Sequence, residues 1–93
     1  MMAVINHRRL KNRSTIVIDW EILKALSGGP RGPSALARIT NVPFERLADY
    51  LKPLMDRGLV GRESVDGHDL YHVSAEGMEV LDDLDKALPK LVP

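Results

Sequence analysis

The chain has 93 residues, 44% of them apolar and 28% charged, and its 13 basic side chains balance its 13 acidic ones. This length allows one compact core, and this composition is ordinary for a folded domain, so we expect neither a second domain nor a disordered chain. The sequence has no cysteine, which excludes disulfides and thiolate metal sites, and zero net charge removes the general electrostatic argument for nucleic-acid binding.

The two ends of the chain have opposite charge. Residues 1–13 contain Arg8, Arg9, Lys11 and Arg13, whereas residues 74–93 hold five acidic and two basic side chains. Because the first segment has few apolar anchors, we expect a flexible basic arm over residues 1–13 that joins the first helix when the protein is bound. A solvated tail is the other interpretation.

Apolar residues at helical spacing predict a first helix after Ser14 or Thr15, both of which are good N-caps. The series consists of Ile16, Ile18, Ile22, Leu23 and Leu26. The helix is expected to end at Ser27-Gly28-Gly29-Pro30, because glycine accepts the left-handed conformation that follows a helix and proline cannot continue one.

A second, short helix is predicted to open at Gly32-Pro33-Ser34 and to end at Thr40-Asn41, with Leu36, Ala37 and Ile39 as its buried side.

A third helix is predicted from about Pro43 to Arg57, with Asn41 as its cap and Gly58 as its terminator. Pro53 lies inside it and should bend it, because proline removes one backbone hydrogen bond and crowds the preceding turn. The residues expected in the core are Phe44, Leu47, Leu51, Leu54 and Met55.

Two strands, 59–65 and 70–73, flank Asp66-Gly67, a dipeptide that favours a tight hairpin turn. Ser74 is expected to cap a last helix of about 14 residues, limited by Pro89. Its apolar side is predicted to be Met78, Leu81, Leu84 and Leu88.

The predicted fold is mainly α with a small β-hairpin, in the order helix, helix, helix, strand, strand, helix. The chain resembles the winged helix-turn-helix superfamily in segments 36–41, 50–60 and 71–77. Within that superfamily, it is most similar to the small archaeal transcription-regulator-like members. The resemblance covers residues 14–88 and leaves 89–93 as a C-terminal tail; Ser74 stands where the family often has threonine. It implies double-stranded DNA as the partner, bound by a homodimer that in several members pairs through the C-terminal helix.

In that plan the 43–57 helix enters the major groove and the 59–73 hairpin contacts the backbone. Arg46 is suited to read guanine and Lys52 to contact phosphate, while the resemblance adds Pro43 and Tyr50 as groove neighbours. The expected DNA-binding residues are Arg8, Arg9, Lys11, Arg13, Arg31, Arg38, Pro43, Arg46, Tyr50, Lys52 and Arg62. The same helix face is also compatible with an ordinary solvated surface.

Acidic groups oppose this hypothesis, because Glu45 and Asp49 lie on the predicted reading face and residues 66–69 form an acidic hairpin tip. The alternative is a protein-interaction module that keeps the winged-helix scaffold without binding DNA.

The leucines of the last helix allow two interpretations. Leu81, Leu84 and Leu88 repeat at the spacing of a helix that packs on a partner helix, which predicts dimerisation, but the same series also fits packing on the chain's own first helix.

No residues form a catalytic constellation, so we expect a protein that acts by binding alone, without cofactor or metal. His68 and His72 share one face of a strand but lie roughly 13 Å apart at strand rise, too far to hold one ion. No apolar run approaches the roughly 20 residues of a membrane span, so a cytoplasmic location without a membrane partner is expected.

Overall fold

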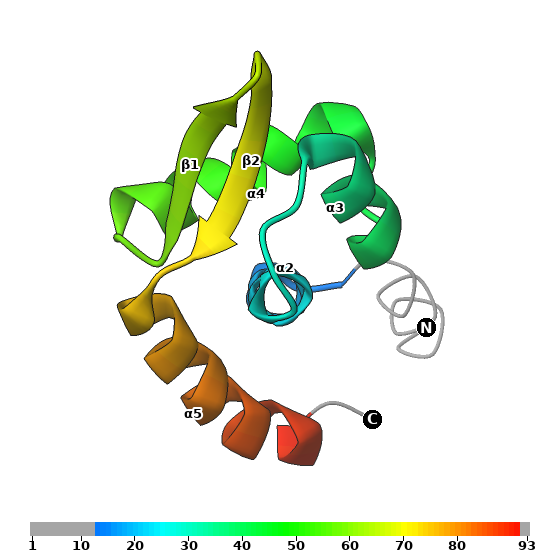
Figure 1. Cartoon of the computed structure of the whole chain (residues 1–93). Helices are drawn as coiled ribbons and strands as arrows, with labels where there is room; N and C mark the ends of the chain where they lie inside the picture. Colours follow the sequence, from blue (N-terminus) through cyan, green and yellow to red (C-terminus); the bar gives the residue numbers. More distant parts are fainter. Residues whose placement is uncertain (1–12, 92–93) are drawn as a thin grey trace, which may run out of the picture.

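The computed structural model describes residues 13–91 of the chain (Figure 1). The predicted order of elements is confirmed. The elements are α2 (Thr15–Ser27), α3 (Pro33–Thr40), α4 (Phe44–Asp56), β1 (Val60–Val65), β2 (His68–Val73) and α5 (Ala75–Leu91).

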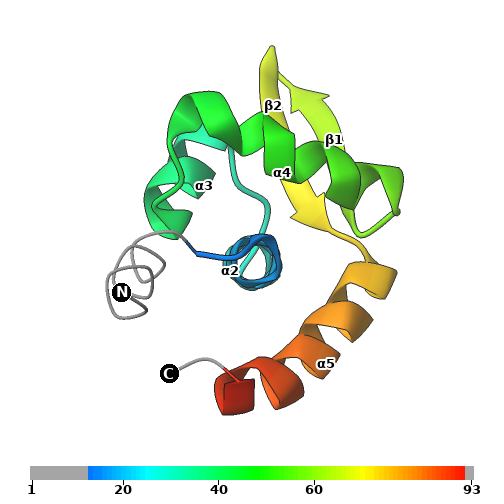
Figure 2. The ribbon, with the colours of Figure 1, turned by 180° about the vertical axis from the view of Figure 1, so that it is seen from behind.

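Helix α2 is the centre of the packing. Figures 1 and 2 view it along its axis, with α3, α4, the hairpin and α5 arranged around it. Its buried residues meet leucines from α3 and α4, and burying such side chains is the main source of folding free energy. The largest fully buried side chains are Ile22, Leu23, Leu26, Leu36, Leu51 and Leu54.

Three side chains predicted to be buried are exposed instead. Ile39 is 49% exposed, Phe44 57% and Met78 44%. On α3, Thr40 is buried instead of Ile39, and its hydroxyl donates a hydrogen bond to the Leu36 carbonyl. Phe44 and Met78 lie at the margins of the apolar faces of their helices, where other elements decide what is covered.

Two helix boundaries also differ from the prediction. Asn41 ends α3 as predicted, in the left-handed conformation with φ 56° and with its N–H pointing back to the Ala37 and Arg38 carbonyls, but it does not cap α4, whose N-cap is Pro43. Helix α5 continues through Pro89 for 17 residues, because the hydrogen bond that this proline removes belongs to the last turn. Pro53 lies inside α4 as predicted.

The hairpin has the predicted two-residue turn. Val65 pairs with His68, and Asp66 and Gly67 between them have φ values of 52° and 79°. These positive angles match the right-handed twist of the flanking strands. The second strand begins two residues earlier than predicted, at His68.

The start of α5 is fixed to the base of the hairpin. The Ser74 hydroxyl accepts from the Gly77 N–H at 2.9 Å, the predicted cap, and donates to the Gly58 carbonyl at 2.6 Å. A side chain at Gly77 would collide with the Leu59 carbonyl, so glycine is required for this close approach.

Between α2 and α5 lies a hollow of about 150 Å³ whose lining includes Ile16, Asp19, Arg57, Val80 and Leu84. Beside it, the indole N–H of the half-buried Trp20 donates to Asp85 at 2.7 Å. In the described part of the chain, no helix is both long enough and apolar enough to cross a bilayer.

The exposure of Ile39 gives a matched test of the core on one helix. We expect Leu36→Ala to lower the free energy of unfolding by about 2–5 kcal/mol, because Leu36 is fully buried. Ile39→Ala should change it by less than about 0.5 kcal/mol, as at an exposed position. Urea denaturation of both variants measures the difference, and equal losses would contradict this assignment of the α3 faces.

Asp19 gives a second test. Burial raises the pKa of its carboxyl above the ordinary 3.8, and Arg57 opposes this shift more weakly. Because the folded pKa exceeds the unfolded one, the stability that the bound proton contributes is present below pH 3.8 and is lost as pH rises through the folded pKa.

We therefore expect Asp19→Asn to raise the free energy of unfolding at pH 7, with a gain that shrinks as the pH falls toward 4. Denaturation across that range measures it, and Asp49→Asn on the exposed side of α4 is the control. A loss of stability in Asp19→Asn at pH 7 would show that attraction to Arg57 outweighs burial.

Candidate nucleic-acid interface

The connection between α3 and α4 is a short, well-fixed turn. Asn41 supplies its left-handed residue, Val42 is buried at 4% exposure and donates its N–H to the Ala37 carbonyl at 3.0 Å, and Pro43 precedes α4 as its N-cap. Because the side chain of Val42 is held in the core, the direction in which α4 leaves α3 is set by packing.

The exposed surface of α4 divides lengthwise into a central ridge and two flanks. Leu47, Leu51 and Leu54 face the core at 2% exposure or less. The helical period then puts Glu45, Asp49 and Asp56 on the ridge opposite the core. This ridge is acidic, as the sequence indicated.

One flank of α4 faces the start of the described chain across a hollow of about 420 Å³. Four predicted DNA-binding residues, Arg13, Pro43, Arg46 and Tyr50, line this hollow together. The lining is completed by Ile18, Asn41 and Val42, so the hollow lies directly over the α3–α4 turn.

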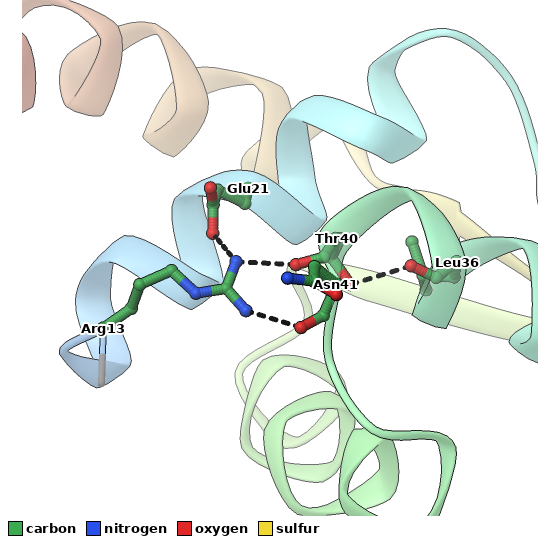
Figure 3. A network of polar contacts seen from close by, with 5 residues as sticks. All are labelled: Arg13, Glu21, Leu36, Thr40 and Asn41. Atoms are coloured by element: carbon green, nitrogen blue, oxygen red, sulfur yellow. Dashed lines mark hydrogen bonds and ion pairs between the residues drawn. The ribbon is translucent and has the colours of Figure 1, made fainter. Parts of the chain in front are cut away.

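Arg13 is bound into the fold, although the sequence assigned it to a flexible arm. Figure 3 shows its guanidinium between α2 and the end of α3, where it pairs with Glu21 and donates to the Thr40 carbonyl at 2.6 Å and the Asn41 carbonyl at 2.9 Å. A cation suits the end of a helix, where free carbonyls and the helix dipole leave negative charge. The other predicted arm residues, Arg8, Arg9 and Lys11, lie outside the described residues.

The second flank faces the hairpin across a hollow of about 440 Å³, which brings Lys52 of α4 and Arg62 of β1 together. The Lys52 ammonium pairs with Asp56 at 3.2 Å, with both side chains largely exposed. An exposed pair of this kind is worth little and leaves the ammonium available to a phosphate.

An adjoining hollow of about 210 Å³ lies toward the start of α3, and it contains Phe44, Ala48 and Asp69. Phe44 was expected in the core, and no prediction was made for Ala48. Their helical spacing puts both on one flank, but only the position of the hairpin shows that this flank is a surface facing β2.

Two predicted contact residues lie outside both flanks. Arg31 is half-buried, exchanges two backbone hydrogen bonds with Tyr71 and donates its Nε to the Ala25 carbonyl at 2.7 Å, so its guanidinium supports the fold. Arg38 is exposed in the last turn of α3 and lines neither hollow.

The predicted dimerisation residues pack within their own chain. Leu81 and Leu88 are buried at 4% and 5% exposure, and Leu84 is half-buried against the core. This is the packing that the second interpretation of these leucines predicted, and pairing between chains stays a prediction. Among the described residues, no cluster of three or more histidine or acidic side chains is spaced to hold a metal ion.

Comparisons with known proteins agree with this geometry. The family model for the winged helix-turn-helix matches residues 12–90. No curated protein matches the sequence.

Several solved structures have the same fold. The transcriptional regulator BldR from Sulfolobus solfataricus is 28% identical with a TM-score of 0.76 over 82% of this chain, which spans only 57% of that protein. RosR from H. salinarum is 29% identical with a TM-score of 0.68, covering 81% of this chain and 76% of that one. Sso10a-2, a DNA-binding protein from Sulfolobus solfataricus, has a TM-score of 0.76 at 16% identity, covering 83% and 80% of the two chains.

Proposed function

The chain belongs to the winged helix-turn-helix family, and from this premise we propose that it binds duplex DNA through α4 and the hairpin and regulates transcription. The observation that carries the proposal is the α3–turn–α4 unit, whose second helix is exposed along its length and has basic side chains on both flanks. The similarity of the chain to BldR, a transcriptional regulator, and to Sso10a-2, a DNA-binding protein, supports it.

The dimensions fit this role. A helix of 13 residues is about 20 Å long, and the major groove of about 12 Å width admits one helix. With α4 in the groove, its first two turns, which include Arg46, lie toward the base edges, and Lys52 further along the helix reaches the phosphates that border the groove. Arg62 adds a backbone contact from the hairpin, and we propose that Arg8, Arg9 and Lys11, which lie outside the described residues, add further contacts.

The acidic ridge sets the character of this binding. Glu45 and Asp49 repel phosphates but accept hydrogen bonds from the amino group of cytosine, so they weaken binding to arbitrary DNA more than binding to a matching site. The same carboxylates favour a second candidate function, a protein-interaction module on this scaffold, whose partner would present basic groups to the ridge.

We expect Arg46→Ala to weaken binding to a labelled mixed-sequence duplex about ten-fold at 50 mM salt, because a guanidinium on the groove-facing flank contacts phosphate or guanine. Fluorescence anisotropy at 50 and 200 mM salt measures the affinity and its salt dependence. The affinity of the unmodified protein should fall steeply between these concentrations, as counterions compete for the phosphates.

The matched control is Lys86→Ala, which removes another exposed cation, one that lies on α5 and lines neither of the two hollows beside α4. Equal effects of the two variants would locate the DNA elsewhere on the molecule. Absence of binding at 50 mM salt would contradict general DNA affinity and make the protein-interaction module the leading candidate.

We also propose that the protein is a cytoplasmic homodimer, that it acts by binding alone without a cofactor, and that residues 14–88 form the functional domain. Residues 89–91, predicted to belong to a C-terminal tail over 89–93, are instead the last residues of α5. Because Leu81 and Leu88 are covered by their own domain, the surface offered to a second copy is the α2–α5 hollow. Half-buried Leu84 and Val80 meet there with Ile16, which is 50% exposed.

Sedimentation velocity should therefore give twice the 10.4 kDa of one chain, and Ile16→Glu should shift the protein to monomer. A carboxylate at this position would be desolvated in the interface, but in the monomer it stays in water. Ile39→Glu is the matched control, since Ile39 is 49% exposed on α3, which does not line the α2–α5 hollow, and its replacement should leave the dimer intact. A monomeric wild-type protein would rule the dimer out.

A further inference from the structure

Phe44 is a large aromatic side chain that the fold does not use. It is 57% exposed at the first position of α4, whereas Leu47, one turn later, is 2% exposed. Leaving an aromatic ring in water forfeits the free energy that burial would give. An exposed ring on the helix proposed to enter DNA is therefore an apolar contact available to a ligand.

The surroundings of Phe44 are apolar with a single charged group. The hollow that it lines is formed otherwise by Pro33, Leu47, Ala48, Leu51, Tyr71 and Asp69. Ala48 lies one turn after Phe44 on the same flank, so the two present a continuous apolar strip along α4. Asp69 repels phosphate, which makes this strip a place for a base edge.

The neighbouring hollow shares Ala48, Leu51 and Tyr71 with the first, and its charged side chains are Asp49, Lys52 and Arg62. The apolar strip is thus bordered by two cations against one carboxylate, a net positive surface that suits a DNA backbone. An apolar strip next to cations fits a DNA duplex, in which apolar groups lie close to phosphates. The apolar group that a base edge presents in the major groove is the C5 methyl of thymine.

We propose that Phe44, supported by Ala48, is a specificity-determining residue that contacts thymine methyl groups in the major groove. The inference rests on the proposed function, because it requires α4 to lie in that groove. It gives the bound sites a preference for thymine on the hairpin side of the helix, next to the phosphates that Lys52 and Arg62 contact.

The test removes the methyl group and leaves the rest of the DNA unchanged. The probes are the labelled mixed-sequence duplex used for Arg46→Ala and the same duplex with deoxyuridine in place of every thymidine. Both have the same phosphates and hydrogen-bonding edges. At 50 mM salt we expect the thymine duplex to bind about four-fold more tightly for each methyl group buried, as the transfer of one methyl from water predicts.

In Phe44→Ala the two duplexes should bind equally. This variant should fold normally, because the ring is mostly in water already, and thermal denaturation checks that. Met78→Ala is the control: it removes another exposed apolar side chain, 44% exposed on α5, and should keep the preference for thymine.

The outcomes separate the two proposals. Equal binding of both duplexes by the unmodified protein would overturn the role of Phe44 while DNA binding stands. A preference that persists in Phe44→Ala would also overturn it, because the methyl groups would then act through the shape of the duplex. Failure to bind either duplex would instead overturn the proposed function itself.

Discussion

A reciprocal pair of backbone hydrogen bonds holds the two halves of the interface together. The Arg31 N–H donates to the Tyr71 carbonyl at 3.0 Å, and the Tyr71 N–H donates to the Arg31 carbonyl at 2.9 Å. The connection between α2 and α3 thereby pairs with β2 at one position, and the Arg31 side chain ties it to the end of α2. Since Tyr71 is buried and lines the hollows between α4 and the hairpin, this pair fixes how far the hairpin stands from α4.

Charge on this surface is arranged by position. Arg46 and Lys52 stand on the two flanks of α4 and Arg62 on the facing strand β1. The ridge of α4 carries carboxylates, of which Asp49 also lines the hollow that holds Lys52 and Arg62. A DNA duplex has its phosphates at the groove margins and its base edges in the middle, so this pattern follows that of the proposed ligand although the net charge of the chain is zero. Because the net charge is zero, the protein lacks the long-range attraction of a cationic protein to DNA, so the proposed recognition depends on contacts at short range.

The sequence predicted the turns and caps that depend on neighbouring residues. It did not predict the exposure and contacts of side chains that depend on elements far away in the chain. The hairpin turn at Asp66-Gly67 and the cap at Ser74 follow from local conformational preferences, and both are confirmed. The exposure of Phe44 depends on where β2 lies, and the structural role of Arg31 depends on a strand some forty residues later in the chain. Arg13 looked like part of a solvated arm because its acceptors, the carbonyls that end α3, become available only through the fold.

The N-terminal end of α4 is fixed by more interactions than its C-terminal end. Its beginning is fixed by the left-handed Asn41, by buried Val42 and by the Arg13 guanidinium on the preceding carbonyls. Toward its end, Pro53 removes a backbone hydrogen bond within the helix. Reading a base edge requires side chains held to a fraction of an ångström, whereas a lysine on a long flexible stem can find a phosphate over a wider range. Phe44 and Arg46 stand at the firmly held end and Lys52 stands next to Pro53. Under the proposed function, we therefore expect discrimination between sequences to come from the first two turns of α4, and the later turns and Arg62 of the hairpin to contribute affinity that is independent of sequence.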